Sequence, residues 1–284
     1  ALLLVWHVGP PLAPAIPLPS IEPGGSVLLA VGDIGSCDGT DDDAVADLAA
    51  RLPGTIALLG DIVYPDGSSA DYADCFDPAW GSLRARIRPA LGNHDYQTTD
   101  ASGYFSYFGA AAGTPGAGWY SYGLGTWHVI VLNSNCDAVG GCGPGSPQLA
   151  WLEADLAASG AASPAACTLA YWHHPRYSSG RHGDDDRTDA LWTALATAGA
   201  DLVLTGHDHD YERLALADGI RSFVVGTGGR SLYELTRPAG PHTELRADDS
   251  YGLLMLTLGE SAYEWRFVPA PGSSLVDAGS GTCH

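Results

Sequence analysis

Five short hydrophobic runs of this chain each end in side chains that bind metal ions, and this recurrence narrows the possible folds more than any other feature. In an open α/β sheet, ligands bind beyond the carboxyl ends of the strands. A single Gly-Asp pair carries little meaning, whereas five such endings point to one shared site. The residues at the five endings are Asp33; Asp61 and Tyr64; Asn93, His94 and Asp95; His173 and His174; and His207 and His209.

The clearest ending is the stretch Gly206–Arg213, which contains His207 and His209 and follows an apolar run. Alternate residues of an extended segment point the same way, so both imidazoles can converge on one ion. Alone, this pattern fits a polar loop equally well. Together the endings supply seven nitrogen and oxygen ligands, which suits two ions that share a bridging carboxylate. The predicted ligands are Asp33, Asp61, Tyr64, Asn93, His173, His207 and His209.

The order and spacing of these motifs resemble the calcineurin-like metallophosphoesterase superfamily. Within that superfamily, the tyrosine at position 64 makes the chain similar to the purple acid phosphatases, in particular to a small, single-domain bacterial type. The motifs cover residues 33–213, and the last 70 or so residues of the chain carry none. The motifs are Asp33-Ile34-Gly35, Gly60-Asp61-x-x-Tyr64, Gly92-Asn93-His94-Asp95, His173-x-Pro175 and Gly206-His207-x-His209.

The resemblance implies two metal ions and an activity. Asp33, Tyr64 and His209 would bind one ion, Asn93, His173 and His207 the other, and Asp61 would bridge them. A phenolate is a hard anionic oxygen, so the Tyr64 site is expected to hold ferric iron, with zinc, manganese or iron as a divalent ion beside it. The expected reaction is hydrolysis of phosphate monoesters, in which a metal-bound hydroxide attacks phosphorus in line.

Further residues receive expected roles from their positions beside the ligands. His94 is expected to contact the phosphoryl oxygens and protonate the leaving group, with Asp95 orienting its ring. In related phosphatases, histidines that contact the substrate lie in a loop corresponding roughly to that of His182. His174 is expected to support the site or lie in a loop. Glu212 and Arg213 are expected to hold the His207 loop through hydrogen bonds, and Asp184–Asp186 to form a solvated surface.

The periodicity of the chain predicts an α/β fold of the mixed α+β kind. Strands and helices alternate at first, and strands follow one another in the last third, which implies one mixed sheet or two packed sheets with helices outside. The resemblance implies the second form, a four-layer αββα sandwich. We expect an N-terminal proline-rich arm (1–25) and one catalytic domain (26–284). Helices are expected at 41–52, 78–87, 147–158 and 188–198, hairpin strands within 104–125, and strands at 126–132, 221–226, 251–258 and 262–268.

Six cysteines, an even number without a C-x-x-C motif, favour three disulfides in a secreted protein over a metal site. The spacing favours the pairs Cys37–Cys75, Cys136–Cys142 and Cys167–Cys283, although six cysteines allow fifteen pairings. No run approaches the ~18 apolar residues of a membrane span. The net charge of −20 argues against a nucleic-acid-binding surface. The expected partners are a phosphate ester and inorganic phosphate.

Three other functions compete with a phosphomonoesterase. A phosphodiesterase or nucleotidase could use the same metal core, and a nucleotidase often adds an aromatic platform for the base, for which Tyr104, Tyr107, Phe108 and Trp119 are available. A serine/threonine protein phosphatase fits less well, because its Gly-Asp-x-Val-Asp-Arg-Gly motif is absent. A protein that binds metal without catalysis is the remaining alternative, and His94 argues against it because metal binding alone does not require that residue.

Overall fold

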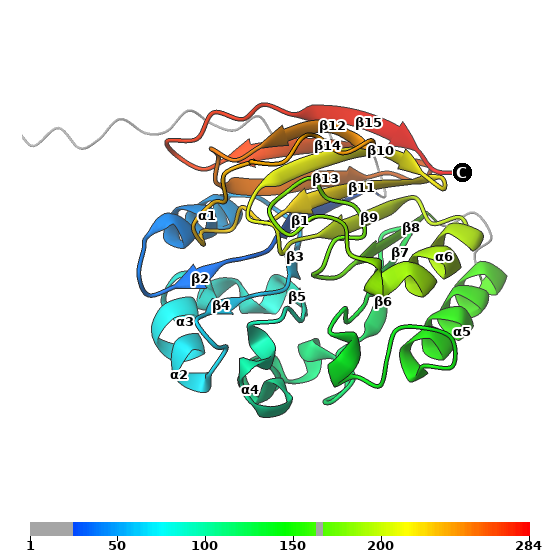
Figure 1. Ribbon diagram of the computed structural model, residues 1–284, viewed down its shortest axis with the longest axis horizontal. Coiled ribbons are helices and arrows are strands. Elements are labelled where there is room, and N and C mark those ends of the chain that lie inside the picture. Colours follow the sequence, from blue (N-terminus) through cyan, green and yellow to red (C-terminus); the bar gives the residue numbers. More distant parts are fainter. Residues whose placement is uncertain (1–24, 163–166) are drawn as a thin grey trace, which may run out of the picture.

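A computed structural model of the chain describes residues 25–162 and 167–284. The expected N-terminal arm therefore lies, except for its last residue, outside the described residues. Within the described part, two large mixed sheets account for most of the strands (Figure 1).

The first sheet has six strands in the order β15-β14-β13-β1-β3-β5. Its strands β1, β3 and β5 are parallel, whereas β13, β14 and β15 are added antiparallel to one another and to β1. Side chains on both faces of β1 are buried, which explains why its sequence is a continuous hydrophobic run. The strands are β1 (Ser26–Val31), β3 (Thr55–Leu59), β5 (Ile87–Ala90), β13 (Gly252–Leu258), β14 (Ala262–Pro269) and β15 (Ala278–Thr282).

The second sheet has seven strands in the order β12-β10-β11-β9-β8-β7-β6. Its centre, from β7 through β8 and β9 to β11, is parallel, and β6, β10 and β12 pair antiparallel. The strands are β6 (Tyr120–Leu124), β7 (Trp127–Val131), β8 (Thr168–Tyr171), β9 (Leu202–Thr205), β10 (Tyr211–Ala217), β11 (Ile220–Val225) and β12 (Thr243–Ala247). A separate short pair joins β2 (Gly35–Ser36) to β4 (Val63–Tyr64).

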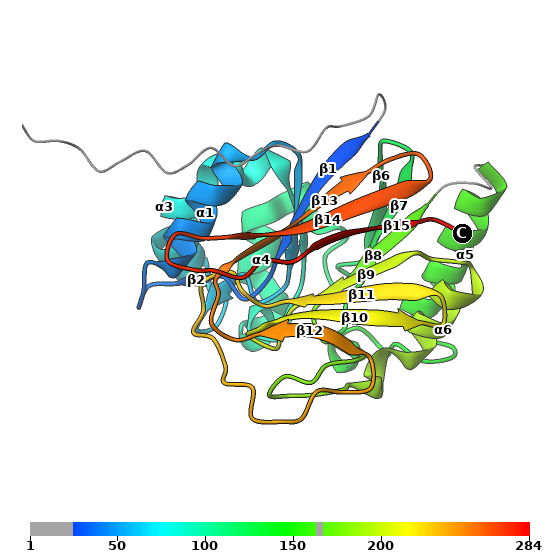
Figure 2. The same cartoon turned by 90° about the horizontal axis from the view of Figure 1, so that it is seen from above.

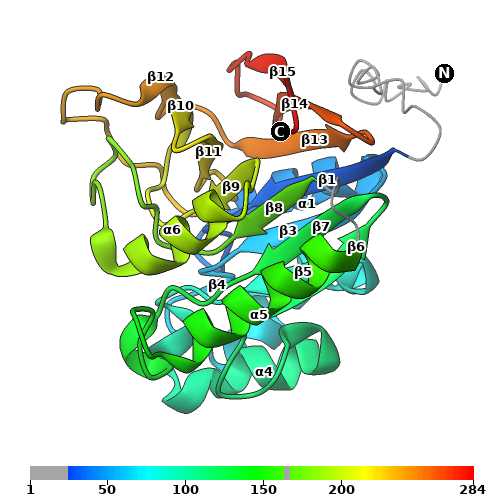
Figure 3. The same cartoon turned by 90° about the vertical axis from the view of Figure 1, so that its right-hand side faces the viewer.

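Three hydrophobic clusters show that the molecule has four layers. One cluster lies between the two sheets, a second between the first sheet and α1, α3 and α4, and a third between the second sheet and α5 and α6. Figure 2 shows α1 and α3 on one side of the strands and α5 and α6 on the other, and α5 and α6 face the viewer in Figure 3. The αββα sandwich is therefore confirmed. The helices are α1 (Asp41–Arg51), α2 (Ser69–Asp71), α3 (Asp77–Trp80), α4 (Ser102–Phe108), α5 (Pro147–Ala162) and α6 (Asp189–Thr197).

The prediction of hairpin strands within residues 104–125 is wrong for its first half. Ser102–Phe108 forms helix α4, and only Tyr120–Leu124 is a strand. Tyr104 and Phe108 lie four residues apart, on one face of the helix, and both are buried against the aromatic side chains of the outer cluster. Tertiary packing thus overrides the strand propensity of the aromatic residues.

Two further boundaries differ from the prediction. The helix expected at 78–87 is the four-residue α3, followed by a 3₁₀ segment (Gly81–Arg86), and Ile87 already belongs to β5. The helix expected at 147–158 runs four residues further, to Ala162. Strands β12 and β15 were not predicted, since short edge strands carry little hydrophobic periodicity.

All three predicted disulfides are present: Cys37–Cys75, Cys136–Cys142 and Cys167–Cys283. Cys37 follows β2, so the first bridge ties the loop beyond β1 to the segment leading into α3. The third joins the start of β8 to the C-terminal end of the chain. None of the helices in residues 25–162 and 167–284 combines the length and hydrophobicity that crossing a bilayer requires.

Candidate metal centre

Strand ends from both sheets meet at one edge of the sandwich. Asp33, Asp61 and Asn93 follow strands β1, β3 and β5 of the first sheet, whereas His173 and His207 follow β8 and β9 of the second. The two sets of loops are joined by hydrogen bonds. Gly32 N donates to Val225 O at 2.9 Å, and His207 N donates to Asp33 Oδ2 at 2.8 Å. The seven predicted ligands thus come together as the sequence pattern requires.

Asp33, Tyr64 and His209 form the first half of the centre. The Tyr64 hydroxyl lies 3.0 Å from Asp33 Oδ1 and 3.2 Å from His209 Nε2, and His209 Nε2 lies 3.3 Å from Asp33 Oδ1. All three side chains are buried. Strand β4 places Tyr64 here, because it pairs with β2 directly beyond the Asp33 turn.

Asn93, His173 and His207 form the second half. His173 Nε2 lies 3.2 Å from Asn93 Oδ1 and 3.3 Å from His207 Nδ1. His173 is fully buried, whereas Asn93 and His207 are half-buried. This half of the centre therefore faces the solvent more than the first.

Asp61 lies between the two halves. Its Oδ2 atom is 3.0 Å from the Tyr64 hydroxyl and 3.4 Å from His173 Nε2. Its other oxygen, Oδ1, accepts a hydrogen bond from His94 N at 2.7 Å, which fixes the orientation of the carboxylate. A single carboxylate oxygen thus contacts a ligand group from each half, which is the position of a bridge.

The imidazole rings are oriented by hydrogen bonds to backbone carbonyls. His173 Nδ1 donates to Leu59 O and His209 Nδ1 to Ser231 O, each at 2.8 Å. With Nδ1 protonated, the Nε2 lone pair of each neutral ring points into the centre. The carbonyl groups of Leu59, at the end of β3, and of Ser231 therefore orient both histidines so that they can bind a cation.

The first half of the centre contains more acceptors than its protons can satisfy. Asp33 Oδ1, Asp61 Oδ2 and His209 Nε2 all lie within 3.2 Å of the Tyr64 oxygen, which has one proton to donate. Positively charged ions would resolve this arrangement. The donor set of carboxylate, phenolate, amide and imidazole fits two such ions.

Three of the predicted ligands have strained backbone conformations. Asp33, Asp61 and His207 have φ values of 59°, 48° and 71°, in the left-handed region that non-glycine residues rarely occupy. Such conformations persist only where the surroundings enforce them, and they concentrate at functional sites. Gly92 is needed next to Asp61, because a Cβ there would lie 2.2 Å from Asp61 N.

Among the protein groups alone, burial and mutual charge shift the pKa values strongly. Burial, the largest single effect, lowers the pKa of His173, but the charge and hydrogen bond of Asp61, together with Asp33 and the Leu59 carbonyl, raise it to about 9. Burial, and then the neighbouring His173, lower the pKa of His207 to about 3. Burial and then the charges of Asp33 and Asp61 raise the pKa of Tyr64 well above its usual value, so a phenolate here needs a bound cation.

His94 lies at the mouth of the centre, half-buried, with its Nε2 4.0 Å from Asp61 Oδ2. Its ring packs against Tyr64, and its Nδ1 lies 2.5 Å from Pro65 O. No hydrogen bond joins the Asp95 carboxylate to the His94 ring. This buried carboxylate instead accepts hydrogen bonds from Gly92 N and the Tyr72 hydroxyl. Burial, and then the charge of Asp61, raise the pKa of Asp95 to about 7.

His182 also reaches the centre, from the loop after β8. Its ring stacks on His207, and its Nδ1 lies 3.0 Å from Asp208 Oδ1. His174 is buried behind the ligands, where its Nδ1 lies 2.8 Å from Ser134 Oγ. Glu212 binds Ser178 and Ser179 and so holds the His182 loop rather than the His207 loop.

Other predicted polar residues lie away from the centre. Arg213 pairs with Glu244 of strand β12 and with Asp277, which directly precedes β15. Asp184 and Asp186 are exposed, as expected, whereas Asp185 is half-buried. Asp184 also accepts a hydrogen bond from Ser178 N.

Three residues near the centre escaped the sequence analysis because they follow the last motif or carry no pattern. Arg230 lies over the ring of Tyr64 at 4.9 Å from its centroid. Tyr233 stacks on His209 with centroids 3.9 Å apart, and Arg181 lies over Tyr233. The glycine-rich turn between β11 and Arg230 is the only sequence feature that could have indicated Arg230. This turn brings the backbone of Arg230 to the centre, where Arg230 N donates a hydrogen bond to Asp33 O.

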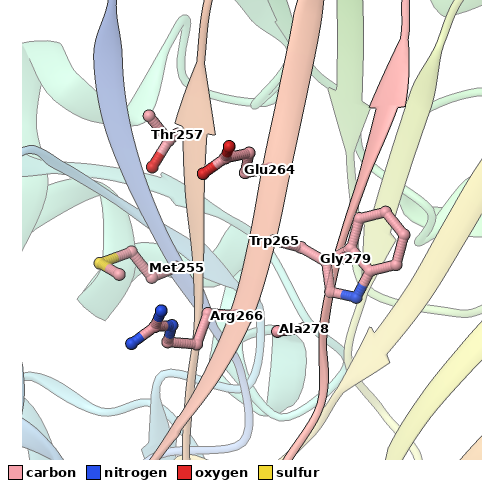
Figure 4. A pocket seen from close by; sticks show the side chains of 7 residues that line it. All are labelled: Met255, Thr257, Glu264, Trp265, Arg266, Ala278 and Gly279. Carbon is pink, nitrogen blue, oxygen red and sulfur yellow. The ribbon is translucent and has the colours of Figure 1, made fainter. Parts of the chain in front are cut away.

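A small cavity on another part of the molecule is unrelated to this centre. It opens among strands β13, β14 and β15 and has a volume of about 100 Å³ (Figure 4). That volume is below the ~300–1,000 Å³ typical of small-molecule sites. The lining residues are Met255, Thr257, Glu264, Trp265, Arg266, Ala278 and Gly279, none of which belongs to the centre.

The four-layer sandwich and the candidate ligands at its strand ends agree with the resemblance to the calcineurin-like phosphoesterases. The sequence pattern of the calcineurin-like phosphoesterases matches residues 26–211, more than half of the chain. The chain belongs to this family, and within it the chain resembles the purple acid phosphatases.

Relatives and solved structures agree with this membership. Purple acid phosphatase 15 of Arabidopsis thaliana is 28% identical over 229 residues, which cover 69% of this chain and 42% of the relative. The chain thus spans less than half of that relative's length. The yellow lupin (Lupinus luteus) purple acid phosphatase PPD1 has a similar fold, with a TM-score of 0.74 at 18% identity over 91% of this chain and 54% of that one.

A second structural neighbour is GAP50, described as the anchor in the inner membrane complex of Plasmodium. Its TM-score is 0.72 at 12% identity, over 92% of this chain and 89% of that chain. At such identities the two solved structures show the fold alone. The family as a whole implies a centre of two metal ions, which agrees with the donor set described above.

Proposed function

We propose that this protein hydrolyses phosphate monoesters at a dinuclear metal centre, as a purple-acid-phosphatase-like enzyme. The observation that carries the proposal is the position of Asp61 Oδ2, which contacts Tyr64 of one ligand group and His173 of the other. Asp33, Tyr64 and His209 would hold one ion, and Asn93, His173 and His207 the second. Asp61 would bridge the two.

The ligands favour different ions in the two halves. The first half offers a carboxylate and a phenolate, both hard anionic oxygens, which suit a trivalent ion such as ferric iron. The second half offers two imidazoles and an amide, which suit divalent zinc, manganese or iron. A trivalent and a divalent ion together with Asp33, Asp61 and the Tyr64 phenolate give a net charge of about +2, which attracts phosphate despite the acidity of the chain.

The ions, when bound, supply Lewis acidity and lower the pKa of water toward ~7 or below. The side chains of the protein would position the substrate and donate a proton to the leaving group. Pro65 O accepts a hydrogen bond from Nδ1 of His94, so Nε2 of the same ring is free at the mouth of the centre. We assign His94 to the phosphoryl oxygens and the leaving group, and His182 to a second contact with the substrate. Asp95 has a supporting role, since its carboxylate holds the Gly92 turn through Gly92 N.

Phosphodiesterase or nucleotidase activity remains the alternative on the same metal core. Of the aromatic residues expected as a base platform, Tyr104 and Phe108 are buried in the outer cluster, whereas Tyr107 and Trp119 are half-buried. A non-catalytic role is the remote alternative, because a fold by itself does not determine function. An assay therefore has to decide between them.

The test compares p-nitrophenyl phosphate with bis-p-nitrophenyl phosphate, on protein with measured metal content. We expect faster turnover of the monoester, and a loss of at least about 10³-fold in kcat for Asn93→Ala, which removes a ligand. Faster turnover of the diester would favour the alternative. Near-normal rates for Asn93→Ala would refute the assignment of the centre.

The remaining proposals concern the whole chain. Three disulfides support export to an oxidising compartment. We further propose that residues 26–284 form one catalytic domain, since strands from both ends of this range pair within the same sheet. Free thiols in the protein isolated from its natural source would contradict export.

A further inference from the structure

Two arginines near the mouth of the centre have no acidic partner. Arg181 is exposed and Arg230 is half-buried, and within residues 25–162 and 167–284 neither forms an ion pair. By contrast, Arg187 of the same loop as Arg181 pairs with Asp185. In a chain with a net charge of −20, two unpaired arginines beside one centre indicate that they bind an anion.

A stack of side chains connects Arg181 to the centre. The Tyr233 ring lies almost parallel to the His209 imidazole, with centroids 3.9 Å apart and planes 8° apart. The Arg181 guanidinium lies over the same Tyr233 ring, with its central carbon 4.8 Å from the centroid. Because the imidazole fills one face of Tyr233, the guanidinium lies against the other face. His209 is buried, Tyr233 half-buried and Arg181 exposed, so the stack leads from a predicted metal ligand to the surface.

Hydrogen bonds hold the segment that carries Arg230 and Tyr233. Arg230 N donates to Asp33 O at 3.0 Å, and Tyr233 N donates to His209 O at 2.9 Å. Between them, Ser231 O accepts a hydrogen bond from His209 Nδ1 at 2.8 Å. The segment is thus fixed to two predicted ligands. Because Tyr233 is held in place, it supports the guanidinium of Arg181 and lowers the entropy that this side chain loses on binding an anion.

The charges of both arginines act on the same hydroxyl group. Burial, and then the charge of Asp33, raise the pKa of Tyr233. The charges of Arg181 and Arg230 act on this pKa in the opposite direction, so both guanidinium groups lie near the Tyr233 hydroxyl. Glu234, the exposed acid of the same segment, forms no ion pair with either arginine in the part of the chain that the structure describes.

The two arginines lie at different distances from the centre. Arg230 lies over the Tyr64 ring, so its charge is beside the first half of the centre. Arg181 lies beyond the Tyr233 ring, on the face turned away from the ligands. His182, which we assign to the substrate, directly precedes this outer region, since it follows Arg181 in the chain and lies edge-on to Tyr233. A substrate that extends past His182 therefore reaches Arg181.

We propose that Arg181 binds a second phosphate group of the substrate, and that the protein therefore prefers esters with two phosphates on one short carbon skeleton. The inference rests on the proposed phosphomonoesterase function and names a substrate class for it. Arginine forms paired, charge-assisted hydrogen bonds with phosphate. Two phosphates joined through one oxygen fit less well, because the stacking distances of 3.9 and 4.8 Å place Arg181 a whole side chain beyond His209. The two phosphates of a sugar bisphosphate are further apart.

The test compares fructose 1,6-bisphosphate with fructose 6-phosphate, on protein whose metal content is measured. We expect kcat/KM to be about tenfold higher for the bisphosphate, and this preference to be lost in Arg181→Met. Arg181→Lys should keep part of it, because lysine retains the charge but not the planar fork. A change in stability or metal content would alter both rates, so the ratio of the two kcat/KM values reports the specificity alone.

The matched control is Arg84→Met. Arg84 is also exposed and also lies over a tyrosine ring, that of Tyr107. It precedes β5, whereas the predicted ligand Asn93 follows the other end of that strand. The ratio of the two kcat/KM values in Arg84→Met should therefore equal that of the wild type.

Two results would overturn the proposal. One is an equal ratio in wild type and Arg181→Met, and the other is a wild-type ratio no larger than two equivalent phosphate groups provide by themselves. Absence of turnover of both esters would instead refute the proposed function. The same two compounds then serve as ligands in isothermal titration calorimetry, where we expect about tenfold tighter binding of the bisphosphate and its loss in Arg181→Met. Equal affinities in that titration would overturn the proposal as well.

Discussion

The imidazole ring of His182 stacks on that of His207, with ring centroids 4.2 Å apart and ring planes 28° apart. His182 comes from the loop after β8 and His207 from the end of β9. Because Asp208 Oδ1 engages His182 Nδ1, the other nitrogen of the ring remains available at the mouth of the centre. The stack therefore positions a hydrogen-bond donor beside a predicted metal ligand.

His182→Ala is expected to lower kcat/KM for p-nitrophenyl phosphate by about 10- to 100-fold, since a hydrogen bond to a charged phosphoryl oxygen is lost. Metal content should not change, because His182 is not a ligand. Steady-state kinetics and metal analysis measure the two effects. His284→Ala, which removes a half-exposed histidine beside Asp201, is the control. Loss of metal from His182→Ala would contradict the assigned role.

Arg230 provides a second prediction. Its guanidinium lies over the Tyr64 ring and donates to Ser36 Oγ at 3.2 Å, so its charge is held beside the first half of the centre. Arg230→Met is expected to raise KM for the monoester, and the inhibition constant of inorganic phosphate, by about tenfold. Arg230→Lys should restore only part of the affinity for the monoester and for phosphate, because lysine lacks the planar guanidinium group.

The matched control for Arg230 is Arg266→Met, which removes an arginine from the cavity on β14. Its KM should equal that of the wild type. An unchanged phosphate inhibition constant in Arg230→Met would show that this arginine does not take part in anion binding.

The metal ligands could be predicted from the sequence because each follows a strand that is buried on both faces. Such strands appear as continuous hydrophobic runs, and the residues directly after them lie at one edge of the sheet. Asp33 after β1 and His173 after β8 are examples. The pattern is local in the sequence, so it can be recognised without knowledge of the three-dimensional contacts.

Other parts of the site depend on contacts between distant segments and could not be predicted. The orientation of His94 comes from Pro65 O, which the sequence does not indicate, and Asp95 was expected there instead. Arg230 reaches Tyr64 from a segment 166 residues further along the chain. Glu212 can be buried in a strand because Ser178 and Ser179, from a distant loop, donate hydrogen bonds to its carboxylate.

Asp42 gives a prediction about pH. Burial and then the charge of Asp43 raise the pKa of Asp42 from 3.8 to about 6. Well below pH 3.8 this group is protonated in the folded and unfolded states alike, so it has no effect on stability there. Between about pH 4 and pH 6 mainly the unfolded chain ionises, and the folded state loses stability as the pH rises. Above pH ~6 both states ionise, and the loss of stability stays at its maximum of about 3 kcal/mol.

Asp42→Asn is therefore expected to stabilise the fold at pH 7.5 by up to about 3 kcal/mol more than at pH 4. Urea denaturation of variant and wild type at both pH values measures the difference. Asp47→Asn on the exposed face of the same helix is the control and should show almost no pH-dependent difference. Equal effects of Asp42→Asn at the two pH values would contradict the raised pKa.

The disulfides differ in the length of chain that they close, and this sets the order of their contributions to stability. Cys167–Cys283 spans 116 residues, whereas Cys136–Cys142 spans 6. Closing a longer loop removes more entropy from the unfolded chain, by about 2–3 kcal/mol for this pair of lengths. The double variant Cys167→Ser/Cys283→Ser should therefore lose more stability than Cys136→Ser/Cys142→Ser. Urea midpoints measured on metal-loaded protein provide the comparison, and a reversed order would show that native packing around the short loop outweighs chain entropy.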